Sequence, residues 1–344
     1  MEYIYSFIIS GDYPLIGVKE IKRLIKAKDV KFHVLSHKYK LLRISTRISP
    51  KRLLELLYES ACLQKIVLER SCESGKVNLR TILRAVEKID WSHLEGRSFC
   101  VFVDKIVKIP IPSPKIAKEV GNIIKSKVPL SRVDLENPDI KVNVILHEGL
   151  VVIGDLIWKF RRDRFKFRKP DLRPAFSPCA LTPTFAKVLI NLGLTNPPGR
   201  MLDPFCGVGS ILVEAALMGI YSIGVDVKRT LIKECRRNLM AYSSYPLVDL
   251  IVADAKSLPL REEAIRMVIT DLPYGKLSPT LSRDPNELTS KFLKEITYSM
   301  KKGSRAVLVY DRELPDAPHL KILERYRVYV HRSLTRVIHL AVPK

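Results

Sequence analysis

The stretch Asp203-Pro204-Phe205-Cys206-Gly207-Val208-Gly209-Ser210 directly follows the short predicted strand 200–202, and Asp271-Leu272-Pro273-Tyr274-Gly275 directly follows the apolar run 267–270. Each stretch therefore lies where a predicted strand ends. In an open parallel sheet, ligands bind outside the carboxyl ends of the strands. The two stretches are thus predicted to face one crevice of a parallel α/β sheet.

These stretches carry different chemistry. Gly207 and Gly209 allow the backbone to approach a small cofactor closely, because glycine lacks the Cβ that would block it. Asp271, Pro273 and Tyr274 place a carboxylate, a proline-stiffened carbonyl and an aromatic ring side by side. That combination suits a flat ring bearing an amine, such as a nucleobase. Either stretch alone could be an ordinary turn, so the prediction depends on the pair.

Two more carboxylates follow predicted strands between these stretches. Asp226 ends the apolar run 221–225, where a carboxylate can accept hydrogen bonds from both ribose hydroxyls of a nucleoside. Asp254 and Ala255 follow the run 248–252, where they could read the edge of an adenine, although Asp254 could instead only cap a turn. The Gly-rich turn is too short for a dinucleotide fingerprint and no phosphate-binding loop follows, which argues against a dehydrogenase or an NTPase.

In this order the segments resemble the motifs of class I S-adenosylmethionine-dependent methyltransferases, in the branch that methylates exocyclic amines. The resemblance implies a doubly wound, Rossmann-like α/β sheet over residues 175–344, with an antiparallel last strand from a hairpin of 322–330 and 334–342. It also implies S-adenosyl-L-methionine as the cofactor. The implied cofactor-binding residues are Asp203, Phe205, Gly207, Gly209, Asp226, Asp254 and Ala255, and the implied catalytic residues are Asp271, Pro273 and Tyr274.

The first half of the chain predicts a different fold. Residues 1–64 alternate apolar strands with helices of 3.6-residue periodicity, which indicates a small α+β unit of ferredoxin-like type. A helix is predicted at 50–60, and the next predicted element is a helix at 79–89. A strand, a helix and an apolar hairpin then follow as far as residue 158.

The segment Val133-Asp134-Leu135-Glu136-Asn137-Pro138-Asp139 resembles the signature of THUMP domains, which bind RNA and occur in RNA-modifying enzymes. This resemblance covers residues 65–158. In that family the domain holds the 3′ end of tRNA and sets its distance to the catalytic domain. Lys115 and Lys118, on the preceding predicted helix, either line the RNA face or are only solvated.

Residues 159–174 are predicted to be a basic linker in which phenylalanines alternate with arginines and lysines. Basic residues with aromatic rings suit a phosphate backbone and unpaired bases. A hinge that packs its phenylalanines between domains is the alternative, and both readings can hold together. The linker residues predicted to bind RNA are Arg161, Arg162, Arg164, Lys166 and Arg168.

Composition supports a polyanionic partner. The 344 residues include 59 Lys+Arg against 36 Asp+Glu, a formal net charge of +23, and the excess is present in both halves. Such a field favours encounter with nucleic acid, although thermophilic proteins are also rich in charged residues. No apolar run reaches the ~18 residues of a membrane span, and the first residues lack the basic part of a signal peptide. A cytoplasmic protein that does not contact membranes is expected.

The six cysteines show no metal-ligand spacing, so no metal site is predicted. Cys62 and Cys72 could form a disulfide, but buried free thiols are the favoured interpretation. Cys206 has no base spaced to activate it. Enzymes that methylate carbon 5 of cytosine carry a cysteine after a proline, where this chain has Tyr274.

The run 173–183, both stretches above and His331-Arg332-Ser333-Leu334-Thr335-Arg336 together resemble the archaeal tRNA guanine-10 N2-methyltransferases over essentially the whole chain. The resemblance implies a monomeric enzyme that methylates guanine 10 of tRNA once or twice. Val208 departs from the pattern, since these enzymes often carry Thr or Ser there. The alternatives are guanine N2-methylation elsewhere in tRNA or in rRNA, adenine N6-methylation of DNA, and a non-catalytic RNA-binding protein on a methyltransferase scaffold.

Overall fold

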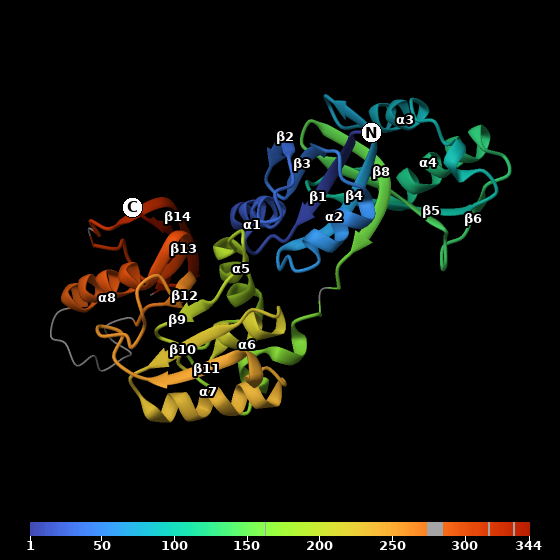
Figure 1. Ribbon diagram of the computed structural model, residues 1–344. Helices are drawn as coiled ribbons and strands as arrows, with labels where there is room; N and C mark the ends of the chain where they lie inside the picture. Colours follow the sequence, from blue (N-terminus) through green and yellow to red (C-terminus); the bar gives the residue numbers. More distant parts are fainter. Residues whose placement is uncertain (162, 274–284, 316, 333) are drawn as a thin grey trace. The chain divides into compact units, whose positions relative to one another are not determined.

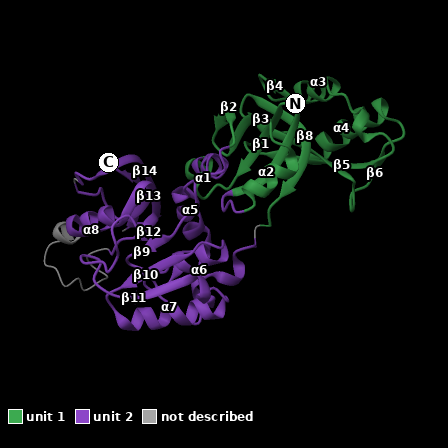
Figure 2. Ribbon diagram, in the orientation of Figure 1, with its two compact units in different colours: residues 1–18, 30–58, 63–162 green, residues 19–29, 59–62, 163–344 purple. Residues whose placement is uncertain are grey.

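The structure is a computed structural model that describes residues 1–161, 163–273, 285–315, 317–332 and 334–344. The chain divides into two compact units (Figure 2). Unit 1 comprises Met1–Val18, Val30–Tyr58 and Leu63–Arg162, and unit 2 comprises Lys19–Asp29, Glu59–Cys62 and Asp163–Lys344. The domain boundaries inferred above from sequence stay predictions.

Unit 1 is built on an eight-stranded sheet with the strand order β2-β3-β1-β4-β8-β7-β5-β6 (Figure 1). Its neighbouring strands are antiparallel, except that β5 is parallel to both β7 and β6. The strands are β1 (Tyr3–Ile9), β2 (Phe32–Lys38), β3 (Leu41–Thr46), β4 (Leu63–Ser74), β5 (Ser98–Lys105), β6 (Arg132–Val133), β7 (Ile140–His147) and β8 (Leu150–Lys159).

Strand β4 was not predicted from the sequence, and it joins the two halves of this sheet. It pairs with β1 on one side and with β8 on the other. Its pairing with β8 shifts register between Glu69 and Ser71, so the alternation of apolar and polar residues breaks within the strand. A bulge of this kind hides a strand from a pattern search. The two predicted parts of unit 1, residues 1–64 and 65–158, therefore share one continuous sheet.

Two helices, α3 (Leu79–Glu87) and α4 (Ser113–Lys127), cover one face of the part of the sheet that contains β5, β7 and β8. The other helices of unit 1 are α2 (Pro50–Leu57) and the beginning of α1 (Pro14–Lys26). Ile82 of α3 and Ile116 of α4 pack with Val142 and Val144 of β7 in one buried cluster. Because successive strand residues point to opposite faces, Lys141 and Phe102 belong to the face that these helices leave open.

Unit 2 is built on a seven-stranded sheet with the order β11-β10-β9-β12-β13-β15-β14. Its first five strands in that order run parallel, and β15 is antiparallel to both β13 and β14. The antiparallel terminal hairpin predicted from the sequence is thereby confirmed. The strands are β9 (Met201–Asp203), β10 (Ser222–Asp226), β11 (Val248–Val252), β12 (Ile265–Asp271), β13 (Met300–Tyr310), β14 (Leu320–His331) and β15 (Leu334–Pro343).

Helices lie on both faces of this sheet, as a doubly wound fold requires. Val268 of β12 packs in one cluster with Phe292 of α8, whereas Ile269 faces the opposite side, against Gly193 of α5. Thr182 caps α5 by accepting a hydrogen bond of 3.3 Å from the Phe185 amide, and Pro183 occupies the first turn, as the sequence predicts. The helices are α5 (Pro183–Gly193), α6 (Ser210–Leu217), α7 (Arg229–Ala241) and α8 (Pro285–Ser299).

Candidate active site

Carboxylates gather where the parallel strands of unit 2 end. Asp203 is the last residue of β9, Asp226 of β10 and Asp271 of β12. These strands are neighbours and parallel, so their carboxyl ends share one edge of the sheet. The described residues of the two stretches therefore lie at one edge of the sheet, as predicted.

The Gly-rich turn between β9 and α6 is held against β10. The Cys206 amide donates to the Val225 carbonyl at 2.9 Å, and the Gly209 amide donates to the Cys206 carbonyl at 2.8 Å. Gly207 and Gly209 have φ angles of +50° and +85°, which side chains disfavour. A Cβ on Gly209 would lie 2.5 Å from Cys235 Sγ, whereas the space beside Gly207 is open within 4 Å. The turn thus offers bare backbone ahead of the N-terminus of α6.

Asp226 fixes this turn through its carboxylate. Its Oδ2 accepts a hydrogen bond from the Gly207 amide at 3.0 Å, and its Oδ1 accepts one from the Lys228 amide at 2.9 Å. The side chain remains half-exposed at the end of β10. It therefore lies beside the turn, where a nucleoside ribose would need acceptors.

Asp203 lies deeper than the other carboxylates. It is 2% exposed, and its Oδ1 accepts hydrogen bonds from Thr270 Oγ1 at 2.7 Å and from the Phe205 amide at 3.4 Å. Burial raises the pKa of Asp203 to about 7, and the charges of Asp226 and Asp271 add to that effect. The buried side chain joins two strands, and its predicted contact with a cofactor stays a prediction.

The remaining predicted cofactor residues follow the carboxyl ends of β9 and β11, and their contact with a cofactor stays a prediction. The Phe205 ring meets the Phe292 ring edge-on, with centroids 5.0 Å apart. Asp254 accepts a hydrogen bond of 2.9 Å from the Lys256 amide, which is the turn-capping interaction considered above. Ala255 is buried in the core cluster beneath the sheet. The Ala253 amide donates to the Asp226 carbonyl at 3.3 Å, so this loop is held against β10.

Asp271 faces a cation that the sequence reasoning did not assign. Arg336 Nη2 of β15 lies 3.5 Å from Asp271 Oδ2. The run 331–336 was recognised only as a feature of the family's ending, and nothing in it indicated a partner on β12. The Leu272 amide donates to the Val309 carbonyl at 2.9 Å, which continues the strand pairing up to Pro273. Tyr274 lies outside the described residues.

Some of the residues predicted to bind RNA have structural partners in unit 2. Arg168 donates to the buried Glu214 carboxylate through Nε at 2.8 Å and Nη2 at 3.1 Å. Arg164 Nη2 donates to the Ala61 carbonyl at 2.9 Å. Arg162 lies outside the described residues. The exposed members of the set are Lys115, Lys118, Arg161 and Lys166.

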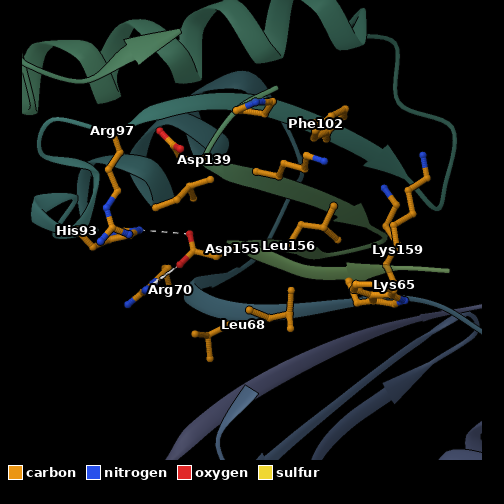
Figure 3. Close-up of a pocket in the computed structure, with 15 residues that line it drawn as sticks. Lys65, Leu68, Arg70, His93, Arg97, Phe102, Asp139, Asp155, Leu156 and Lys159 are labelled. Carbon is orange, nitrogen blue, oxygen red and sulfur yellow. Dashed lines mark hydrogen bonds and ion pairs between the residues drawn. The ribbon is translucent and has the colours of Figure 1, made fainter. Parts of the chain in front are cut away.

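Unit 1 contains a groove that the sequence did not reveal (Figure 3). It encloses about 750 Å³ on the open face of the sheet. Two aromatic side chains are exposed there, Phe102 at 37% and Trp158 at 41%. The groove's basic residues outnumber its carboxylates, and they come from separate parts of the chain. Its charged residues are Lys65, Arg70, Arg97, Lys141 and Lys159 against Asp139 and Asp155.

Within this groove, Asp155 holds two neighbours in place. Its Oδ2 accepts from Arg70 Nε at 2.8 Å, and its Oδ1 lies 3.3 Å from His93 Nε2. These contacts keep the pKa of Asp155 below its usual value despite burial. Lys65 is paired with Asp104.

The described residues show neither a disulfide nor a cluster of side chains that could bind a metal ion. None of the six cysteines, all of which the structure describes, forms a disulfide, so Cys62 and Cys72 are not bridged. Among the described residues, no cluster of three or more His, Cys, Asp or Glu side chains could hold a metal ion. None of the described helices is long and apolar enough to cross a membrane.

Comparison with known proteins identifies both parts of the chain. Residues 76–154 match the THUMP domain family, and residues 170–337 match the RMKL-like methyltransferase domain family. The tRNA (guanine(10)-N2)-dimethyltransferase of Methanothermobacter thermautotrophicus is 32% identical over 258 residues, covering 74% of this chain and 76% of that protein. The enzyme of the same description from Pyrococcus abyssi is 31% identical over 271 residues, covering 76% and 79%.

A solved structure extends the likeness to the whole fold. TrmN from Thermus thermophilus superposes with a TM-score of 0.56 at 22% identity, covering 100% of both chains. A THUMP domain precedes a class I methyltransferase sheet here, and the enzymes above match most of the chain. The chain therefore belongs to the family of the archaeal tRNA (guanine(10)-N2)-dimethyltransferases.

Proposed function

We propose that this protein transfers methyl groups from S-adenosyl-L-methionine to the N2 amine of guanine 10 in tRNA, and that it proceeds from the monomethylated to the dimethylated base. The observation that carries the proposal is the meeting of Asp271 and the Gly-rich turn at one sheet edge. The family's named activity supports the choice of guanine 10. We expect a monomer that acts in the cytoplasm, where its tRNA substrate is found.

The residues at this edge fit the proposed cofactor. The bare backbone at Gly207 and the half-exposed Asp226 carboxylate would take its nucleoside end, with Asp254 and Ala255 nearby. The carboxylates of Asp226 and Asp271 suit a positively charged ligand. When bound, S-adenosylmethionine supplies a methyl group on a cationic sulfur.

The residues at the carboxyl end of β12 carry acceptors for the N2 amine of guanine. Guanine N2 is a poor nucleophile because its lone pair is delocalised into the ring. Two acceptors, the Asp271 carboxylate and the carbonyl of Leu272 or Pro273, would accept hydrogen bonds from the two N–H groups of the amine. These hydrogen bonds would localise the nitrogen lone pair. The released proton goes to Asp271 or to water. The base must first leave the helical stack, and the rate gain then comes mainly from positioning.

The groove of unit 1 is our candidate for contact with unpaired nucleotides of the tRNA (Figure 3). Exposed Trp158 and Phe102 offer faces on which bases can stack, and Lys141, Arg97 and Lys159 offer charges for phosphates. Trp158 and Lys159 end β8, directly before the basic linker. The groove is therefore a second candidate RNA surface of unit 1, on the face of the sheet opposite to α4.

Methyl transfer to unmodified tRNA transcripts, followed by nucleoside mass spectrometry, tests the substrate. We expect N2-methylated guanine in the wild-type transcript and none in a transcript with adenine at position 10. Undiminished labelling of that control would move the target to another guanine. Labelling of duplex DNA but not of tRNA would favour adenine N6-methylation, and absence of S-adenosylmethionine binding by calorimetry would favour a non-catalytic scaffold.

The amine-binding role of Asp271 has its own test. Asp271→Ala should retain cofactor binding and lose most of its turnover, because the acceptor that localises the amine lone pair is removed. Near-normal turnover of this variant would refute the role. Asp249→Ala, at an exposed position of β11, is the matched control and should leave turnover unchanged.

Tryptophan fluorescence tests the groove. The chain has two tryptophans, of which Trp91 is 1% exposed, so a quench on addition of short single-stranded RNA would report Trp158. Trp158→Phe should abolish the signal. Lys141→Glu should weaken tRNA binding and lower the salt slope by about 0.7, as expected for loss of one phosphate contact on a single strand. Unchanged binding by Lys141→Glu, with weakened binding by Lys118→Glu on α4, would place the RNA on the helical face instead.

A further inference from the structure

Arg336 connects three elements of unit 2 at the candidate active site. Its Nη2 lies 3.5 Å from Asp271 Oδ2, and both side chains are mostly buried, at 14% and 16% exposed. Its guanidinium carbon lies 5.6 Å from the centroid of the Phe185 ring of α5. Val337, the next residue, pairs with Tyr310 at the end of β13. Arg336 therefore lies past the end of β13, where it can reach the end of β12.

Arg336 supplies positive charge at a sheet edge where several strands end in carboxylates. The charges of Asp271 and Asp226 both raise the pKa of the buried Asp203 carboxyl, so Asp271 has a second carboxylate, Asp203, close by. Like charges disfavour the ionised form, whereas an opposite charge within about 4–6 Å favours it. Among the described residues, Asp203 and Arg336 are the charged groups shown to interact with Asp271, and Tyr310 is a further titratable side chain at the end of the neighbouring strand β13.

We propose that Arg336 is a positioning residue for methyl transfer: it keeps the Asp271 carboxylate ionised and turned toward the amine of the target base. This inference rests on the proposed function, in which Asp271 accepts the amine N–H. Phe185 contributes by holding the guanidinium plane, because a cation is attracted to an aromatic face. An arginine suits this place because its planar fork is pre-organised for a carboxylate.

Two substitutions separate this role from simple packing. Arg336→Met keeps an apolar stem over Phe185 and removes the charge, whereas Arg336→Lys keeps the charge on a different stem. We expect the Lys variant to retain kcat within about tenfold of wild type and the Met variant to lose about a hundredfold, with the KM for tRNA within about threefold in both. A packing role predicts that Met performs as well as Lys or better, and that outcome would overturn the proposal.

The pH dependence of kcat is the second readout. Without the cation, Asp271 should remain protonated to higher pH, so the acidic limb of the Met variant's profile should move upward while that of the Lys variant stays near wild type. An unmoved limb in the Met variant would also contradict the proposal. Arg327→Met is the matched control, because Arg327 lies exposed on the same hairpin and should leave both readouts unchanged.

A double-mutant cycle gives a readout that does not depend on the substrate. Asp271→Asn, Arg336→Met and the double variant are compared by chemical unfolding. We expect the two substitutions to be coupled by about two- to tenfold in the unfolding equilibrium, as for a partly buried ion pair. Additive effects would mean that the side chains do not interact and would refute the inference. The proposed function fails separately, when wild-type protein leaves guanine 10 unlabelled.

Discussion

Thr270 Oγ1 donates a hydrogen bond of 2.7 Å to Asp203 Oδ1, and this bond joins the carboxyl ends of the neighbouring parallel strands β12 and β9. Thr270 directly precedes Asp271, and Asp203 directly precedes the Gly-rich turn. The bond therefore couples the strand that would hold the base to the strand that would hold the cofactor. Burial disfavours the ionised form of the Asp203 carboxylate, and this effect outweighs the Thr270 hydrogen bond, which favours it.

Asp203→Asn should change how stability depends on pH. Burial raises the pKa of Asp203 from 3.8 to about 7 in the folded protein. Its contribution to stability is therefore present below about pH 4 and is lost as the pH rises through 7. Asparagine keeps an acceptor for Thr270 but cannot ionise. We expect the variant to be more stable than wild type at pH 8, by up to about 4 kcal/mol.

Urea unfolding at a series of pH values checks this expectation. The wild type should lose stability between pH 4 and 7 relative to the variant. Asp249→Asn, at an exposed position of β11, should leave the pH dependence unchanged. Parallel curves for wild type and Asp203→Asn would show that Asp203 does not titrate in this range.

Gly209→Ala should disrupt the proposed cofactor site. The φ of +85° disfavours any side chain, and the added Cβ would meet the buried Cys235 Sγ at 2.5 Å. We expect a loss of stability of about 2 kcal/mol and a fall in S-adenosylmethionine affinity of about tenfold or more, measured by calorimetry. Gly219→Ala is the control, because Gly219 has φ +73° in open space and should cost only about 1 kcal/mol. Equal effects of the two substitutions would show that the contact with Cys235 is irrelevant.

Glu20→Ala should be strongly destabilising. The Glu20 carboxylate in α1 is fully buried. It accepts hydrogen bonds from Asn191 Nδ2 and Ser60 Oγ, both at 2.7 Å, and from the Ala61 and Cys62 amides at 2.6 and 2.9 Å. Alanine would leave these donors buried without their acceptor. We expect a loss of about 3–5 kcal/mol in unfolding free energy, with a smaller loss for Glu20→Gln.

The control for Glu20 is Glu55→Ala on α2. Glu55 is exposed and pairs only with Arg52 one turn away, so this substitution should cost at most about 0.5 kcal/mol. If Glu20→Ala were as mild as Glu55→Ala, the buried carboxylate would have no stabilising role. Thermal or chemical unfolding of the full chain distinguishes the two outcomes.

Arg168→Ala and Lys166→Ala should separate structural from RNA-binding cations in the linker. Arg168 donates to the buried Glu214, whereas Lys166 is exposed beside the Phe167 ring. We expect Arg168→Ala to lose about 3 kcal/mol of stability because a buried carboxylate is left unpaired. Lys166→Ala should leave stability unchanged and weaken tRNA binding at low salt. Filter binding and unfolding of both variants check this, and a reversed pattern would contradict it.

The local sequence pattern was sufficient to predict where several strands and helices of unit 2 begin or end. The residues that end β9, β10 and β12 could be read from apolar runs followed by Asp203, Asp226 and Asp271. The cap at Thr182 was likewise predictable from local pattern. Each of these features depends on neighbours within a few residues, so the sequence by itself determines it. The order of these segments also indicated the family.

Other features depend on residues that are distant in the chain. Strand β4 lies between β1 and β8 in the sheet. Its mixed sequence of polar and apolar residues indicates a strand only when the pairing with these two neighbours is known. Arg336 meets Asp271 because the sheet order places β15 beside β13 and past its end. Arg168 looks in sequence like any solvated cation of the linker, yet it is paired with a buried carboxylate.

The charge and polarity of a side chain can be read directly from the sequence. Which other side chains it contacts depends on how the strands and helices pack. A sheet brings together side chains from whichever strands pair, and pairing is decided by burial of whole faces rather than by single residues. The groove of unit 1 shows the same principle, since its exposed rings and most of its cations come from the four strands β4, β5, β7 and β8. The sequence determined which chemistry is available at the strand ends, and the tertiary structure alone decided which of those side chains meet.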